Sequence, residues 1–336
     1  MSQNTDTRAV MPIRRRTVLK AGAAAAILAA AGPLRAQEGE PTVVLITGTS
    51  SGFGRLMAET FARKGFRVLA TMREVEGRNR PAAEELRSMA RAENLSLDVF
   101  ELDVLSGESV AAAAQEAIAR AGRIDVLISN AGIVVPGPVE LQPPEFFQAN
   151  IDTNALGALR VIRAVVPHMR EAGRGTIIQM SSALGRAIDP MLGGYCASKL
   201  AVEAACDALG YELAASGIEV AVVQPAGAYP TRLQSNALRY WEEMLASLGT
   251  VRRPMLDLYA PHIEAMLEGL EPDASLDPQE VANAVLELAA MEFGTRPSRL
   301  TVGPYADGID PVNAAHEQLQ AEMMAHSPHA NLFTLR

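Results

Sequence analysis

Short runs of Val, Ile and Leu recur along the chain from residue 42, and stretches with helical character separate them. The runs are TVVLITG (42–48), RVLATMR (67–73), LSLDVFELDV (95–104), IDVLISNAG (124–132), GTIIQMSS (175–182), IEVAVVQP (218–225) and SRLTVG (298–303). Continuous apolar strands that alternate with helices are typical of a parallel sheet covered by helices on both faces. The sequence therefore predicts an α/β fold with a doubly wound, seven-stranded parallel sheet.

Residues 1–36 differ from the rest of the chain. A polar start is followed by Arg14–Arg16, a short apolar run and small residues that end at Ala36, which is the layout of a signal peptide. Arg15 and Arg16 resemble the pair of the twin-arginine export signal, although Val18 stands where a larger apolar residue is usual. We expect a signal peptide at 1–36, export to the periplasm by that route, and a single catalytic domain at 37–336. A disordered basic tail, or an uncleaved tag that anchors the enzyme, are the alternatives.

Charge and composition exclude several classes of function. The net charge is −9, and residues 1–36 carry +5, so the body carries −14. An acidic body argues against nucleic acid as a partner. The apolar run at 1–36 is too short for a stable membrane span. The five histidines lack metal-ligand spacing, so we expect no structural metal.

A glycine-rich turn, TGTSSGFG (47–54), joins the first predicted strand to the first predicted helix. Gly48, Gly52 and Gly54 would allow a tight turn, a close approach of the backbone to a pyrophosphate, and close packing of the helix on the sheet. Backbone N–H groups at the helix start would then face the phosphates. A tight turn could use glycine without any ligand, but its place after the first strand of a parallel sheet favours a dinucleotide site.

The spacing Gly-x-x-x-Gly-x-Gly of this turn resembles that of the short-chain dehydrogenase/reductase family. Other segments agree with the family in order and interval: LDV (102–104), NAG (130–132), NALG (154–157) and YCASK (195–199). The resemblance spans residues 42–232 and again the strand near 300. It implies a Rossmann-type fold, a nicotinamide cofactor, a small alcohol or carbonyl compound as substrate, and a homodimer or homotetramer.

The second predicted strand ends at Arg73, and its first acidic residue is Glu74. An acid at this strand end would bind a ribose 2′-hydroxyl, whereas an Arg favours a 2′-phosphate. The sequence therefore favours NADP, with NAD as the alternative; Arg73 could also be merely solvated. The resemblance gives the cofactor-binding residues as Gly48, Ser50, Ser51, Gly52, Phe53, Gly54, Arg73, Asp103, Val104, Asn130, Ala131, Gly132, Tyr195, Lys199, Pro225 and Thr231.

Tyr195 and Lys199 lie four residues apart at the start of a predicted helix, so they share a face. Carbonyl reduction needs a proton donor, and the reverse reaction needs a base, for which an ordinary Tyr pKa of about 10 is too high. A neighbouring ammonium would lower that pKa. The chain uses Arg heavily and has three lysines, Lys20, Lys64 and Lys199, which indicates a need for a compact cation after Tyr195. A solvated Lys on an amphipathic helix is the alternative.

Two further residues complete the catalytic set that the resemblance implies. Ser182 ends the fifth predicted strand, thirteen residues before Tyr195, and corresponds to the family's serine that binds the substrate oxygen. Ser181 should point to the opposite face of the strand. Asn154 and Gly157 interrupt an otherwise good helical pattern, and the resemblance makes Asn154 the fourth member of a tetrad with Ser182, Tyr195 and Lys199.

The segment after the sixth predicted strand departs from the family. Pro225 is present, but Ala226 stands before Gly227 where the family shows Pro-Gly. Thr231 follows and could hydrogen-bond the nicotinamide carboxamide. The departure puts the placement of the nicotinamide in doubt.

These residues predict an oxidoreductase that transfers a hydride between a nicotinamide and a secondary alcohol or ketone. Residues 230–297 interrupt the rhythm before the last strand, and such an insertion is a natural place for substrate-selecting elements. Large apolar residues in and beside it would form an apolar pocket, or would simply pack its own helices: Tyr229, Leu233, Leu238, Tyr240, Trp241, Met244, Met255, Leu258, Tyr259 and Met266. The alternative function is a nucleotide-binding sensor or scaffold without chemistry, which would be expected to lose Tyr195 or Lys199.

Overall fold

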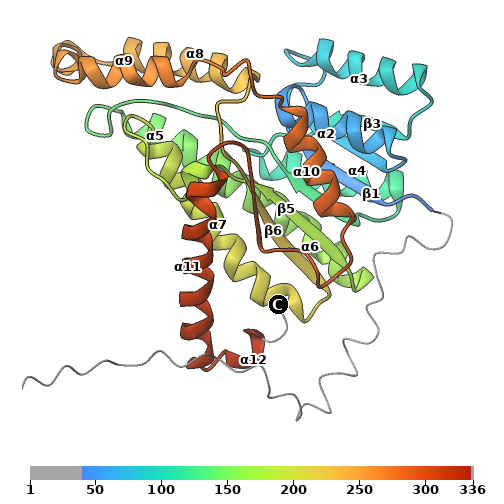
Figure 1. Ribbon diagram of the computed structural model, residues 1–336. Coiled ribbons are helices and arrows are strands. Elements are labelled where there is room, and N and C mark those ends of the chain that lie inside the picture. Colours follow the sequence, from blue (N-terminus) through green and yellow to red (C-terminus); the bar gives the residue numbers. More distant parts are fainter. Residues whose placement is uncertain (1–39, 334–336) are drawn as a thin grey trace, which may run out of the picture. The chain divides into compact units, whose positions relative to one another are not determined.

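The computed structural model describes residues 40–333, and seven parallel strands within them form one sheet (Figure 1). The strands are β1 (Val43–Thr47), β2 (Arg67–Met72), β3 (Leu97–Glu101), β4 (Val126–Ser129), β5 (Gly175–Met180), β6 (Ile218–Pro225) and β7 (Arg299–Val302). Their order in the sheet is β3-β2-β1-β4-β5-β6-β7. The predicted doubly wound fold is confirmed. The export signal expected at 1–36 lies outside the described residues.

Helices cover both faces of the sheet. They are α2 (Gly52–Arg63), α3 (Arg80–Ala92), α4 (Gly107–Ala121), α5 (Pro144–Ile151), α6 (Ala158–Ala172), α7 (Gly193–Ala214), α8 (Arg232–Ser247), α9 (Ala260–Gly269), α10 (Gln279–Ala290), α11 (Ala306–Ala325) and α12 (Ala330–Phe333). Three shorter segments are the π-helix η1 (Asp152–Gly157) and the 3₁₀ helices η2 (Ala183–Gly185) and η3 (Arg253–Tyr259). None of the helices in residues 40–333 has the length and apolar character that crossing a bilayer requires.

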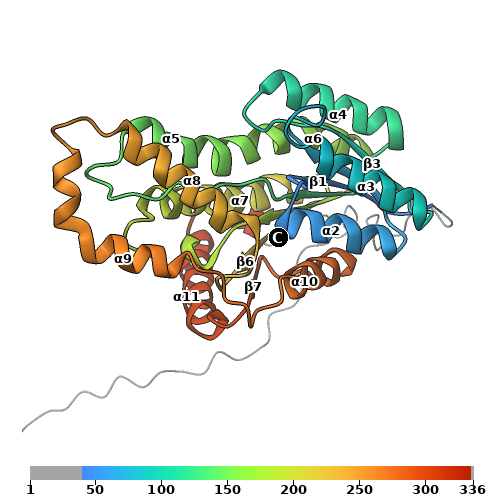
Figure 2. The same cartoon turned by 90° about the horizontal axis from the view of Figure 1, so that it is seen from above.

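Alternation along the strands divides the core into two layers. In β1, Val44 and Ile46 join α2, α3 and α10 in one apolar cluster, whereas Val43 and Leu45 join α4, α6 and α7 in the other. Successive side chains of a strand point to opposite faces, and both faces here are covered (Figure 2). This explains why the strands are apolar at nearly every position.

The strand order reverses between β1 and β4, because β2 and β3 follow on one side and β5, β6 and β7 on the other. Ligands of open α/β sheets bind at such a switch point, beyond the carboxyl ends of the strands. The glycine turn after β1, the NAG segment after β4 and Ser182 after β5 all lie at this edge.

A helical cap follows β6. We use this name for residues 232–270, which comprise α8, η3 and α9. Trp241, Met244 and Met266 of the cap share a buried apolar cluster with Tyr195. The two ends of the cap lie close together, since the Asp273 N–H donates to the Ala228 carbonyl at 2.8 Å. The predicted insertion at 230–297 was too long: α10 packs on α2 as part of a layer of the sheet rather than with the cap.

Candidate active site

The glycine turn between β1 and α2 is built so that only glycine fits. Gly48 and Gly52 have φ of +73° and +56°, a region that other residues rarely adopt. A Cβ on Gly54 would overlap the Gly48 carbonyl oxygen and the Asn130 side chain. Ser51 precedes α2 in an extended conformation, its side chain makes no capping hydrogen bond, and the first turn of α2 carries no acid. The N–H groups at the start of α2 are therefore available to an anion.

Asn130 and Ala131, after β4, hold this turn in place. The Asn130 Nδ2 donates to the Thr47 carbonyl at 2.8 Å, and Thr47 Oγ1 accepts the N–H groups of Asn130 and Ala131 at 2.9 and 3.0 Å. A Cβ on Gly48 would lie 2.9 Å from the Ala131 Cα. The NAG segment thus has a structural role that is independent of any ligand.

Thr231 is brought from the other half of the sheet to the same turn. A Cβ on Gly52 would lie 3.4 Å from the Thr231 Cβ, and the Thr231 hydroxyl caps α8 by accepting the Leu233 N–H at 3.2 Å. The extra residue Ala226 continues the ladder, because its N–H donates to the Val302 carbonyl at 2.8 Å. The departure from Pro-Gly after Pro225 is therefore absorbed beside β7, and Thr231 still reaches the glycine turn.

Arg73 follows β2 at the far end of this edge. The Glu101 carboxylate accepts the N–H groups of Glu74 and Val75 at 2.7 and 2.8 Å, and the Glu74 side chain pairs with Arg78. Glu74 is therefore held by other residues. Within residues 40–333, the Arg73 guanidinium makes no hydrogen bond or ion pair, so it is available to a bound anion.

The remaining predicted cofactor residues are placed less openly. Ser50 is half-buried in the turn. The Phe53 ring packs edge-on against Tyr229, with centroids 5.5 Å apart. Asp103 Oδ1 accepts the Leu105 N–H at 3.0 Å, and the Val104 side chain is buried against Gly157. The side chains of Phe53 and Val104 therefore serve packing, which leaves their backbones for contact with a ligand.

Tyr195, Ser182 and Lys199 meet at the carboxyl end of β5. The Tyr195 phenol hydrogen-bonds with the Ser182 hydroxyl. Lys199 Nζ lies 5.6 Å from the centre of the Tyr195 ring and donates to the Met180 carbonyl at 3.1 Å. Both Tyr195 and Lys199 lie on α7 and are 5–6% exposed. One face of α7 therefore presents a phenol and an amine side by side, as their spacing predicts.

Burial controls the protonation of both groups. Burial raises the pKa of Tyr195 to about 12, against the smaller lowering effect of the Ser182 hydrogen bond. Burial lowers the pKa of Lys199 to about 8, and the charge of Glu203 opposes this. The sequence-based expectation that Lys199 lowers the Tyr195 pKa is wrong for this structure, because the cap and α7 remove the phenol from water.

Asn154 lies in η1, the π-helical segment between α5 and α6. Its side chain accepts the Ile133 N–H at 2.8 Å and donates to the Ile133 carbonyl and to Ser198 Oγ, both at 2.9 Å. A Cβ on Gly132 would lie 3.1 Å from Asn154 Oδ1 and 3.8 Å from Lys199 Nζ. Asn154 therefore ties the segment after β4 to the helix that carries Tyr195 and Lys199. Single π-helical turns are frequent at functional sites.

Comparison with known proteins decides the family. The family model described as short chain dehydrogenase matches residues 42–240. The chain belongs to the short-chain dehydrogenase family. It is an oxidoreductase of the kind that acts on CH–OH groups.

Three similar proteins illustrate the range of this short-chain dehydrogenase family. An uncharacterized oxidoreductase of Bacillus subtilis is 34% identical over 254 residues, which cover 74% of this chain and 85% of that protein. Mouse 17-beta-hydroxysteroid dehydrogenase type 1 is 34% identical over 253 residues, covering 74% and 70%. The crystal structure of actinorhodin polyketide ketoreductase with NADPH has a TM-score of 0.64 or lower, at 0.63, with 27% identity and coverage of 79% and 97%.

Several residues that build this short-chain dehydrogenase site were missed from the sequence. Asn150, one turn before Asn154, clamps Val135 through its N–H and carbonyl, both at 3.0 Å. Glu203, one turn after Lys199, is 1% exposed. Each is a polar residue on a helix face that is otherwise buried, and this violation of the apolar pattern is the signal that could have revealed them.

Proposed function

We propose that this short-chain dehydrogenase transfers a hydride between NADP(H) and a secondary alcohol or ketone, with Tyr195 as the acid/base. The observation that carries the proposal is the convergence of Ser182, Tyr195 and Lys199 beside the glycine turn, at the edge where the sheet order reverses. Asn154 supports the same arrangement from the opposite side.

The protein residues divide the proton chemistry among themselves. A bound nicotinamide would supply or accept the hydride. Tyr195, with a pKa of about 12, is a neutral phenol near neutral pH and can give its proton to the oxygen of a carbonyl that is being reduced. Ser182 would donate a hydrogen bond to the same oxygen. Lys199, with a pKa of about 8, is largely an ammonium at neutral pH, and its charge would favour the phenolate that remains. The described protonation states suit carbonyl reduction.

The cofactor is argued from the chain's own residues. The uncapped start of α2 beside Gly48 and Gly52 fits a pyrophosphate. The unpartnered guanidinium of Arg73 at the end of β2 fits the 2′-phosphate of NADP rather than the hydroxyl of NAD. The similar polyketide ketoreductase was crystallised with NADPH.

The cap supports an apolar substrate. Tyr195 shares its apolar cluster with Leu192 on α7's side and with Trp241 and Met244 of the cap. Of the ten apolar residues expected at the pocket, Leu233, Leu238, Trp241, Met244, Tyr259 and Met266 belong to this cluster or pack against it. Tyr229 lies instead in the core beside the sheet, and Leu258 is 72% exposed. A hydrophobic ketone is thus the favoured substrate class.

The test is a screen of hydrophobic and small charged ketones against wild type and Tyr195→Phe, following NADPH oxidation. Tyr211→Phe is the matched control, since it removes the same atom from the same helix, away from Ser182 and Lys199. We expect turnover in wild type and in the control, and its loss in Tyr195→Phe. Equal turnover in Tyr195→Phe would refute the mechanism. Tight NADP(H) binding without turnover of any ketone or alcohol would favour the sensor.

Two further expectations from the sequence remain proposals. We propose that residues 1–36 direct export by the twin-arginine route, so that Arg15→Lys with Arg16→Lys retains the protein inside the cell; fractionation and N-terminal sequencing would test this. An exported enzyme meets little free NADP, so tight retention of the cofactor or a partner that regenerates it would be required. A homodimer or homotetramer is the expected assembly, which light scattering would measure.

A further inference from the structure

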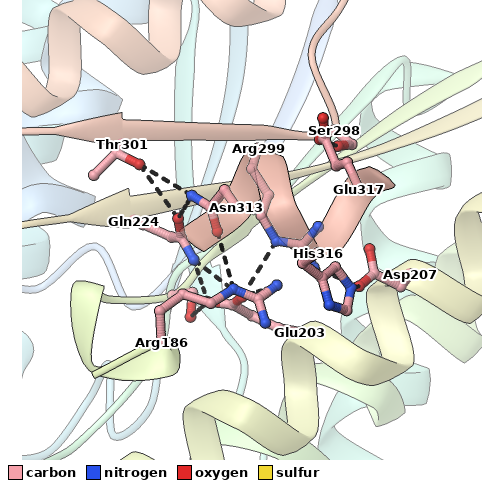
Figure 3. A network of polar contacts seen from close by, with 11 residues as sticks. Arg186, Glu203, Asp207, Gln224, Ser298, Arg299, Thr301, Asn313, His316 and Glu317 are labelled. Carbon is pink, nitrogen blue, oxygen red and sulfur yellow. Dashed lines mark hydrogen bonds and ion pairs between the residues drawn. The ribbon is translucent and has the colours of Figure 1, made fainter. Parts of the chain in front are cut away.

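A buried polar cluster lies next to the catalytic residues and takes no part in the mechanism above (Figure 3). We call it the Glu203 cluster. It joins η2, α7, β6, β7 and α11, and its members are Ser181, Arg186, Glu203, Asp207, Gln224, Arg299, Thr301, Asn313 and His316. The cluster thus connects the loop that carries Ser182 with a helix more than a hundred residues later in the chain.

Glu203 is the centre of this cluster. It follows Tyr195 and Lys199 at four-residue intervals on α7 and is 1% exposed. Its Oε1 accepts Ser181 Oγ at 2.6 Å and Gln224 Nε2 at 2.9 Å, and its Oε2 pairs with Arg186 Nη2 at 3.1 Å and with Arg299 Nε at 3.4 Å. A buried carboxylate persists only when it is paired and hydrogen-bonded in this way.

The loop 181–186 is held by Glu203 at both ends. Ser181 and Ser182 lie on extended backbone and point to opposite sides, Ser181 to Glu203 and Ser182 to Tyr195. Arg186 at the other end pairs with the same carboxylate. A Cβ on Gly185 would overlap Glu203 Oε1, so the loop lies directly against it. The position of the Ser182 hydroxyl is consequently set by Glu203.

Helix α11 closes the cluster from outside. Asn313 Oδ1 accepts Arg186 Nε at 3.0 Å, and Asn313 Nδ2 donates to Gln224 Oε1 at 2.7 Å. These two bonds use both halves of one carboxamide. They orient Arg186 toward Glu203 and Gln224 toward the same carboxylate. Figure 3 shows Asn313 between these two side chains.

We propose that Glu203 is a positioning residue, which fixes Ser182 relative to Tyr195 and Lys199 through Ser181 and Arg186, and that Asn313 of α11 completes this support. The inference rests on the proposed function, because it assigns the cluster to the reaction of Tyr195. It makes the last long helix of the chain part of the catalytic machinery's scaffold, without any contact to substrate.

Position 181 allows a matched test. Ser181→Thr keeps the hydroxyl, whereas Ser181→Val has the same shape without it, so any effect of added volume is shared. We expect kcat to be about tenfold lower in Ser181→Val than in Ser181→Thr, with cofactor binding, followed by quenching of Trp241 fluorescence, equal in both. In a Ser182→Ala background the difference should shrink below about twofold, because the effect acts through Ser182. Equal kcat values, or the same difference in both backgrounds, would overturn the proposal.

A second pair of variants tests α11 and does not depend on the folding of the first. Asn313→Leu removes both hydrogen bonds, and Gln318→Leu makes the same kind of change at an exposed site of α11. We expect kcat to fall about threefold or more in Asn313→Leu only, with cofactor affinity unchanged. If Gln318→Leu lowers kcat equally, or Asn313→Leu leaves kcat unchanged, α11 has no such role. Active Tyr195→Phe would instead refute the proposed function itself.

Discussion

Asn154→Asp is a sharp perturbation because it changes hydrogen-bonding capacity at nearly constant shape. In the wild type, Asn154 Nδ2 donates to the Ile133 carbonyl and to Ser198 Oγ. The Ser198 hydroxyl already gives its proton to the Tyr195 carbonyl at 2.6 Å. It can therefore only accept from residue 154, and a carboxylate there would face two acceptors.

The magnitude follows from counting these groups. Each buried group left without its partner costs about 1–3 kcal/mol. A protonated carboxyl can still donate once, so one acceptor is lost and the cost is about 1–3 kcal/mol. An ionised carboxylate loses both and is itself buried, since Asn154 is 1% exposed, so the cost rises to about 3–5 kcal/mol.

The pH dependence has a definite sign. Burial raises the pKa of the introduced carboxyl above its unfolded value of about 3.9. Between these two values the native variant binds more protons than its unfolded chain, so its stability falls as pH rises. The variant should therefore be weakened more at about pH 8 than at about pH 5, relative to the wild type.

Urea unfolding measures this difference. With a slope of about 3 kcal/mol per molar, the midpoint should drop by about 1 M at pH 8. Gln148→Glu is the control, since it makes the same amide-to-acid change on the exposed side of α5 and should stay within about 0.5 kcal/mol. Coincident wild-type and Asn154→Asp midpoints at pH 8 would refute the hydrogen-bond assignment.

Three other perturbations follow from the site. Gly54→Ala should abolish cofactor binding and lower the unfolding free energy by about 1–3 kcal/mol, because the new Cβ overlaps the Gly48 carbonyl and Asn130; calorimetry of binding and urea unfolding would check this. The lowered pKa of Lys199, about 8 against 10.5, makes the native state release its proton first, so wild-type stability should rise between pH 8 and 10; urea midpoints should show no such rise in Lys199→Met. Arg73→Ala should weaken NADPH binding about 10- to 100-fold and leave NADH binding unchanged, as fluorescence titration would measure; equal loss for both would exclude a 2′-phosphate contact.

Local features of the sequence were enough to predict the sheet and the catalytic tetrad. All seven strands fall within the expected ranges, because apolar runs between helices report burial on both faces. Tyr195 and Lys199 meet because their spacing on one helix fixes a shared face. Asn154 was recognisable because a polar amide and Gly157 interrupt an apolar helix.

Features that depend on distant segments were not predictable. The raised Tyr195 pKa comes from burial that Trp241 and Met244 of the cap help to complete. The role of Glu203 depends on partners from β6, β7 and α11, whose register cannot be read from α7 alone. Tyr229 looked like a pocket residue, but its hydroxyl bonds to Glu280 of α10 and directs the ring into the core.

The closed base of the cap has an evolutionary consequence. Because Ala228 and Asp273 are joined by a backbone hydrogen bond, the intervening stretch begins and ends at nearly the same point of the framework. Segments with adjacent ends tolerate insertion and exchange. Selectivity could therefore change by replacement of one continuous piece of gene, while the tetrad and the dinucleotide cleft, encoded elsewhere, are inherited intact.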